Sequence, residues 1–79
     1  MTAEIVTPEK VLFEGEIYLV RVPGTKGSFE VLKNHVPIVS SLEQGQIKVI
    51  TQKGEELFFD IKSGFIEVAD NNIHLIVRQ

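Results

Sequence analysis

The clearest indication of the fold lies in residues 46–61, which read QIKVITQKGEELFFDI. Polar and apolar residues alternate in 46–51 and again in 56–61, and Lys53-Gly54 lies at the expected centre of the turn between them. Alternation of this kind is typical of a strand that buries one face. Glycine supplies the backbone freedom that a tight hairpin turn requires. The stretch therefore predicts a β-hairpin with one side against a core.

Short apolar runs between Gly, Pro, Asn and Asp continue in both directions from this hairpin. We expect further strands at residues 4–7, 11–13, 16–22, 28–32, 64–68 and 73–77, and an edge strand or irregular connection at 35–39. Pro23-Gly24 predicts a type II turn, with Gly24 at the positive φ that the third turn position requires. About ten short strands are too many for one flat sheet. The predicted fold is therefore all-β, a two-layer β-sandwich or flattened barrel.

The length and composition fit one domain of this kind. The chain has 79 residues, of which 43% are hydrophobic and 24% charged, so we expect a single domain over residues 1–79. The alternation along the predicted strands places one set of side chains in the core. This set comprises Ile5, Phe13, Ile17, Leu19, Phe29, Val31, Leu32, Val39, Ile47, Val49, Leu57, Phe59, Ile66, Val68, Ile73, Leu75 and Val77.

The composition argues against several classes of site. The chain has no cysteine, which excludes a disulfide, a thiolate metal site and a cysteine nucleophile, and its two histidines argue against a zinc site. The net charge is −3 and the Lys and Arg residues are scattered, so there is no basic patch for nucleic acid. No apolar stretch approaches the ~20 residues of a spanning helix, and we expect no direct membrane insertion. We also expect no cofactor.

No arrangement of catalytic residues is visible in the sequence. His74 lies between Ile73 and Leu75 on an alternating strand and is expected to face solvent, and His35 is expected to be a local hydrogen-bonding residue. The acidic residues are spread over separate strands, as on the hydrated face of a sheet. Two features suit contact with another protein: the turn at 23–27 and the aliphatic stretch at 36–39. The residues alone therefore favour a non-catalytic, protein-binding sandwich.

One run resembles a known family. Residues 23–37, PGTKGSFEVLKNHVP, resemble the signature of the epsilon subunit of F-type ATP synthases, in which a Pro-Gly-x-x-Gly turn precedes an apolar strand and a His-x-Pro. Similar segments of that family are matched by residues 5–9, 13–16, 42–45 and 63–68. Two departures lie within the run. Glu30 stands where the family often has Gly, and Lys33-Asn34 where it usually has Pro-Gly.

The resemblance implies a non-catalytic subunit of the ATP synthase rotor. In this family the N-terminal β-sandwich belongs to the central stalk, binds the gamma subunit and the membrane proteolipid ring, and couples ion translocation to ATP synthesis. The implied location is peripheral, on the cytoplasmic side of a bacterial membrane. By motif position, the proteolipid-ring contact falls on Gly24, Thr25, Lys26, Gly27 and Ser28. The gamma contact falls on Thr7, His35, Val36, Pro37 and Ser40.

The resemblance is to a short form of the family. Its members usually continue into a C-terminal helical hairpin that restrains ATP hydrolysis, whereas the present sequence ends at Gln79. Either a naturally short subunit or one domain of a longer protein fits this length. The inhibitory role of the hairpin is not carried over.

Two other classes of function stay open from the residues alone. Lys53, on its predicted hairpin, could be the modified lysine of a lipoyl or biotinyl carrier domain, although carrier families flank that lysine with Asp or Met. A small-molecule-binding sandwich is the other alternative. A small interior argues against it, because a ligand pocket needs about 300 Å³. Ligase modification of Lys53, or a shift of Tm with metabolites, would distinguish these alternatives.

Overall fold

The predicted hairpin is present in the computed structural model, which describes residues 1–79, as β5 (Gly45–Thr51) and β6 (Glu56–Ile61). The two strands are antiparallel. In the turn, the N–H of Gly54 donates to the carbonyl oxygen of Thr51 at 2.9 Å, and Gly54 has a φ of 88°. The turn is therefore centred on Gln52-Lys53, one residue earlier than predicted, because Gly54 takes the left-handed conformation that leads the chain into β6.

Eight strands make up the regular structure, and no helix is present that could cross a membrane. The remaining strands are β1 (Thr2–Val6), β2 (Val11–Val22), β3 (Phe29–Val31), β4 (Ile38–Leu42), β7 (Ser63–Ala69) and β8 (Asn72–Arg78). The expected count of about ten was too high. The runs at 11–13 and 16–22 form one strand, because Gly15 stays paired with Ala3 of β1 and does not end the ladder.

The strand predicted near 35–39 lies further along the chain, as β4. Asn34 has a φ of 67°, and the N–H of His35 donates to the carbonyl oxygen of Leu32 at 3.2 Å, so these residues form a turn. Pro37 has no N–H to give to a ladder. Pairing with β7 consequently starts at Ile38.

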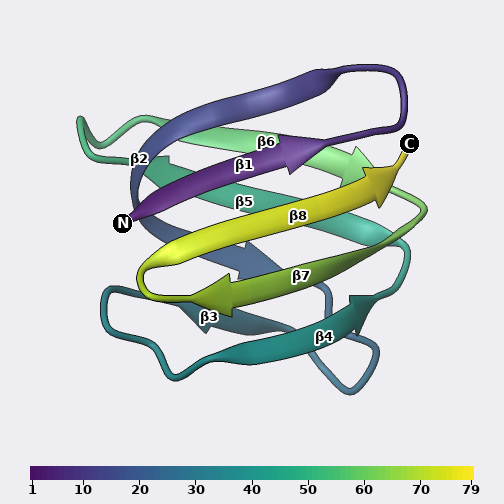
Figure 1. Ribbon diagram of the computed structural model, residues 1–79. Coiled ribbons are helices and arrows are strands. Elements are labelled where there is room, and N and C mark those ends of the chain that lie inside the picture. The colour runs from purple at the N-terminus through teal and green to yellow at the C-terminus, as the bar shows by residue number, and fades with distance from the viewer.

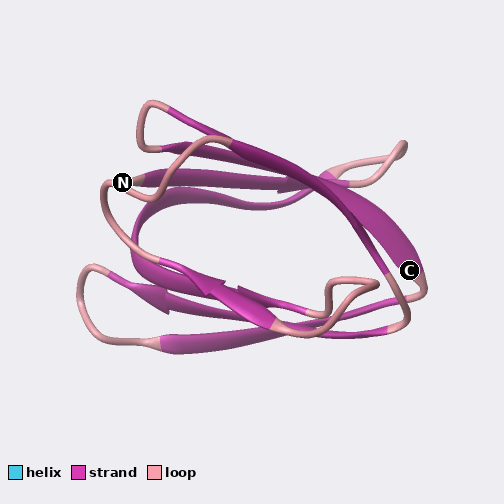
Figure 2. Cartoon of the chain, turned by 90° about the horizontal axis from the view of Figure 1, so that it is seen from below, coloured by secondary structure: helices cyan, strands magenta, loops and turns pink.

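The strands form two layers that are joined through β2 (Figures 1 and 2). Sheet A consists of β4, β7, β8, β1 and the first half of β2, and sheet B consists of β3, the second half of β2, β5 and β6. β1 and β8 are parallel, and the other paired strands are antiparallel. A register shift between Ile17 and Leu19 marks where β2 passes from one layer to the other. The predicted two-layer sandwich is confirmed.

The inner faces of the two sheets meet in a core that contains no buried polar side chain. Its fully buried large side chains are Ile5, Ile17, Ile47, Ile66, Ile73, Leu75, Val20, Val22, Val31, Val49 and Val77. No backbone pairing joins β6 to the first half of β2. There Phe13 and Phe59 pack with ring centroids 6.3 Å apart, so aromatic side chains close the open side of the flattened barrel.

Two residues that were predicted in the core are exposed. Val39 is 73% exposed because β4 starts at Ile38, which puts Val39 on the outer face opposite Glu67. Leu32 is exposed because it follows β3 in a turn. Conversely, Val20 is buried although it was not predicted inside, because the irregularity in β2 lets two consecutive residues face the core.

Candidate functional site

The titratable side chains do not form a catalytic or metal-binding arrangement. His74 is exposed on the outer face of sheet A, as predicted, with its Nδ1 3.4 Å from Oε1 of Glu4. His35 Nδ1 lies 2.7 Å from the backbone carbonyl oxygen of Val36, a local contact like the one expected. No group of His, Asp and Glu side chains converges as a metal site would require.

The outer face of sheet A carries exposed apolar side chains in neighbouring positions. Phe65 on β7 and Ile76 on β8 are direct cross-strand partners, and they are 59% and 58% exposed. Ile76 is in turn opposite Val6 of β1. We call Val6, Ile76 and Phe65 the apolar strip. Val39 of the edge strand β4 lies diagonally next to Phe65. Contiguous apolar surface of this kind marks a site for contact with another molecule.

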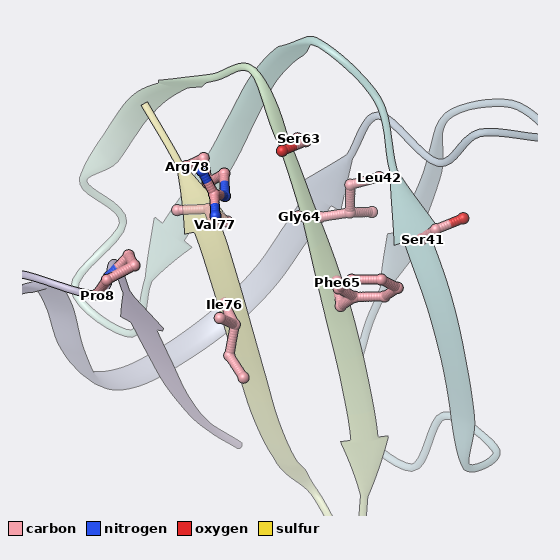
Figure 3. Close-up of a pocket in the computed structure, with 9 residues that line it drawn as sticks. All are labelled: Pro8, Ser41, Leu42, Ser63, Gly64, Phe65, Ile76, Val77 and Arg78. Atoms are coloured by element: carbon pink, nitrogen blue, oxygen red, sulfur yellow. The ribbon is translucent and has the colours of Figure 1, made fainter.

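Ile76 and Phe65 of the apolar strip border a shallow hollow of about 340 Å³. Figure 3 shows Ile76 and Phe65 on adjacent strands, between Pro8 at one edge and Ser41 at the other. The hollow is open to solvent and lined mainly by apolar surface. Its shape suits an inserted side chain of a protein partner better than an enclosed small molecule.

The residues assigned to the gamma contact all belong to sheet A or to its connections, but they do not form one cluster. Thr7 follows β1, where its hydroxyl accepts hydrogen bonds from the N–H groups of Glu9 and Lys10. His35, Val36 and Pro37 precede β4. The register of the sheet puts Thr7 and these residues at opposite ends, with the outer face between them.

Ser40, the remaining gamma-contact residue, is half-buried in β4 opposite Ile66, a core residue. The outward neighbours in β4 are Val39 and Ser41. Sequence reasoning missed Phe65 and Ile76 as surface residues. Alternation could have identified them, because once Ile66 and Leu75 are assigned inward their apolar neighbours must point outward.

The loop assigned to the proteolipid ring is anchored to the end of β4. The N–H of Thr25 donates to the carbonyl oxygen of Ser41 at 3.1 Å, and the two hydroxyls lie 2.9 Å apart. Thr25 to Ser28 are exposed, whereas Gly24 is buried. The loop therefore projects its tip into solvent from a fixed base.

The predicted type II turn at Pro23-Gly24 is wrong. The turn is closed by the N–H of Gly27 donating to the carbonyl oxygen of Gly24 at 2.9 Å, and positive φ is found at Gly27, with 125°, and not at Gly24. Gly24 is required for a different reason. A Cβ at Gly24 would lie 2.7 Å from the carbonyl oxygen of Gly27 and 2.9 Å from the Phe29 ring.

The Lys33-Asn34 departure from the family pattern is explained by the backbone. Asn34 has a φ of 67°, in the left-handed region that glycine adopts readily and asparagine tolerates. The side chain adds a second role. The Asn34 N–H donates to Oδ1 of Asn71 at 2.7 Å, and Nδ2 of Asn71 donates to Oδ1 of Asn34 at 3.3 Å. The connection before β4 is thereby joined to the β7–β8 turn.

Two substitutions at Asn34 should differ in their effect on stability. Asn34→Gly should change the free energy of unfolding by less than about 1 kcal/mol, because glycine keeps the backbone conformation and only an exposed side-chain hydrogen bond is lost. Asn34→Ala should cost about 1–2 kcal/mol more, because alanine is strained at positive φ. Urea unfolding followed by circular dichroism measures both values. Equal values for the two variants would contradict the account.

Comparison with known proteins identifies the family. The family model described as "ATP synthase, Delta/Epsilon chain, beta-sandwich domain" matches residues 1–79. The chain belongs to this family. It is 40% identical over 78 residues to the ATP synthase epsilon chain of Chlorobaculum tepidum, covering 99% of the present chain and 89% of the relative. It is 38% identical over 77 residues to that of Leptospira borgpetersenii, covering 96% of the present chain and 59% of the relative.

Solved structures agree on the fold. A chain in the mitochondrial ATP synthase of Euglena gracilis, solved as OSCP, F1 and c-ring, superposes with a TM-score of 0.90 at 19% identity, over 98% of the present chain and 49% of that chain. A chain in the central stalk and c-ring of the Tetrahymena thermophila enzyme gives a TM-score of 0.83 at 20% identity, over 100% and 63% of the two chains.

The family and the relatives confirm the identification made from the sequence, an ATP synthase epsilon subunit, which is a non-catalytic subunit of that enzyme. The matched relatives are named as ATP synthase epsilon chains and not as lipoyl or biotinyl carriers. The carrier interpretation of Lys53 is therefore without support. Lys53 lies in the β5–β6 turn, exposed, with no feature that distinguishes it from an ordinary turn residue.

Proposed function

We propose that this chain is the part of the ATP synthase rotor that binds the gamma subunit through sheet A and rests on the proteolipid ring through the loop from Gly24 to Ser28. In this role it passes ring rotation, driven by ions, to the catalytic head. The observation that carries the proposal is the apolar strip, whose side chains Phe65 and Ile76 are paired and exposed on the outer face of sheet A. The Tetrahymena chain of like fold occurs in a central stalk and c-ring assembly, which supports the same role.

The mechanical part of the proposal follows from packing. The core is continuous between the two sheets, and no buried side-chain polar atom lacks a hydrogen-bond partner. Protein interiors packed in this way have low compressibility and transmit strain. A small sandwich of this kind would transmit displacement from one contact surface to the other with little internal deformation.

The two proposed contact surfaces adjoin at Ser41. Ser41 lies opposite Phe65 on the outer face of sheet A and accepts the N–H of Thr25 from the loop. A gamma subunit bound along sheet A would therefore lie close to a proteolipid ring in contact with the loop from Gly24 to Ser28. The assembled position would be peripheral, at the cytoplasmic side of a bacterial membrane.

The gamma assignment predicts that Val36→Asp weakens binding of the gamma subunit from the same source by about tenfold. Val36 is 67% exposed, so the change should leave the fold intact while placing a carboxylate in an apolar contact, at a cost of about 1–2 kcal/mol. Tyr18→Asp, an exposed site outside the proposed contact, is the matched control. Titration calorimetry with purified gamma gives both affinities. Unchanged affinity for Val36→Asp would show that this end of sheet A is not in the contact.

A further inference from the structure

A row of acidic side chains runs beside the apolar strip on the outer face of sheet A. Glu67 of β7 is opposite His74 of β8, and His74 is opposite Glu4 of β1. Glu4 is opposite Glu14 in the first half of β2. We call Glu4, Glu14 and Glu67, with His74 among them, the acidic row. Arg78 lies outside this row, opposite Ser63.

The charges on the two sheets are balanced differently. On sheet B, Arg21 pairs with Glu30 at 2.8 Å and Lys48 with Glu56 at 3.5 Å. On sheet A, His74 is the only possible ion-pair partner within 4.0 Å of the acidic row, it is charged only when protonated, and its Nδ1 lies within that distance of Glu4 alone.

Glu4 and Glu14 are directly opposite each other, a placement that destabilises an isolated sheet when both are charged. On sheet B, the remaining acidic side chain, Asp60, accepts a hydrogen bond from Gln46. On sheet A, Glu16 pairs with the N-terminal amine at 3.2 Å, whereas Glu14 and Glu67 have no ion-pair partner within 4.0 Å and are available to an external cation.

The acidic row and the apolar strip have a fixed spacing. His74 and Glu4 each precede a member of the strip by two positions on the same strand, and Glu67 follows Phe65 by two positions because β7 runs antiparallel to β8. Two positions along a strand correspond to about 7 Å. Glu4 and Glu67 are separated by two strand spacings, which together are about 10 Å. A partner covering this face meets an apolar line and, beside it, a line of negative charge.

We propose that the outer face of sheet A docks a protein surface that carries an apolar ridge next to at least two Lys or Arg side chains about 10 Å apart. This rests on the proposed function, in which the partner is the gamma subunit. The negative charge disfavours an anionic lipid surface, and the side chains do not converge on a metal site. The apolar strip supplies contact area, and the acidic row sets register and speeds association.

The charge contribution is measured with a double variant, Glu4→Gln with Glu67→Gln. Its affinity for gamma is expected to fall about tenfold, from the loss of two partly desolvated ion pairs. Raising the salt concentration should weaken wild-type binding more than binding of this variant, because salt screens the charges that the variant lacks. The matched control, Glu30→Gln with Glu56→Gln on sheet B, should bind gamma as the wild type does. Equal affinities for both double variants would overturn the charge requirement.

The closing experiment separates this surface from the identity of the partner. Carboxylates are labelled with a carbodiimide and glycine ethyl ester in the isolated chain and in the membrane-bound ATP synthase, and each site is read by mass spectrometry. Glu4, Glu14 and Glu67 should be protected in the assembly, while Glu56 of sheet B should react equally in both. Gamma binding is measured in parallel.

The four combinations of results test the two claims separately. Protection together with gamma binding supports both. Protection without gamma binding keeps the acidic docking surface and overturns gamma as its occupant. Gamma binding without protection overturns the docking surface and leaves the proposed function in place. Absence of both overturns both.

Discussion

Leu75→Ala is expected to lower the free energy of unfolding by about 2–5 kcal/mol. Leu75 is fully buried, and in β8 it lies between Ile5 of β1 and Ile66 of β7, which are also fully buried. The truncation leaves a cavity at the centre of sheet A that rigid neighbours cannot fill. For a chain of 79 residues the total stability is on the order of 4–12 kcal/mol, so this single change removes a large part of it.

Ile76→Ala is the matched control, one residue along the same strand. Ile76 is exposed on the outer face, and its truncation should change the free energy of unfolding by less than about 0.5 kcal/mol. Urea unfolding followed by circular dichroism gives both values. Similar losses for the two variants would show that the assignment of inner and outer faces of β8 is wrong.

Phe65→Ala is expected to weaken gamma binding by at least about 2 kcal/mol, which is about thirtyfold in affinity. Phe65 is the largest exposed side chain of the apolar strip, and it borders the hollow into which a partner side chain would fit. Aromatic residues in such central positions contribute most of the binding energy of many interfaces. Since the side chain is exposed in the free chain, the stability of the fold should change little.

Phe58→Ala on β6 provides the control for this substitution. Phe58 is 52% exposed on the outer face of sheet B, where it lies opposite Lys48. The Phe58→Ala substitution removes a phenylalanine side chain from the other face of the sandwich, so gamma binding should stay at the wild-type value. Affinities are measured by titration calorimetry with purified gamma. A loss of binding for Phe58→Ala equal to that for Phe65→Ala would contradict docking through sheet A.

Local patterns in the sequence predicted those parts of the fold that depend on neighbours along the chain. The alternation in 46–51 and 56–61 predicted β5 and β6, and the two C-terminal runs predicted β7 and β8. In each pair a short turn fixes the register, so the local sequence was enough to predict which strands pair.

Other features depend on contacts between distant segments. Gly15 was predicted to end a strand, but pairing with Ala3 carries β2 through it. The crossing of β2 from one sheet to the other depends on simultaneous pairing with β1 and β5, which no local pattern specifies. Val39 was misplaced because the first paired residue of β4 is set by Pro37 and the turn before it.

The candidate site was predictable only in part. The motif from residue 23 to residue 37 led to the family, and the family led to a protein-binding role. The apolar strip and the acidic row are products of register across sheet A, since Val6, Phe65 and Ile76 come from three separate strands. Side chains that are far apart in the sequence become one surface only when the strands are paired.

The most direct test of the central claim is recovery of partners from native membranes. A tagged form of this chain, expressed in its source organism and purified in mild detergent, should bring down the gamma subunit and the proteolipid ring in fixed proportion. The Phe65→Ala form should recover much less of the gamma subunit, and the Phe58→Ala form should recover as much as the unmodified chain. Purification of the unmodified chain without gamma and without proteolipid subunits would contradict a role in the rotor.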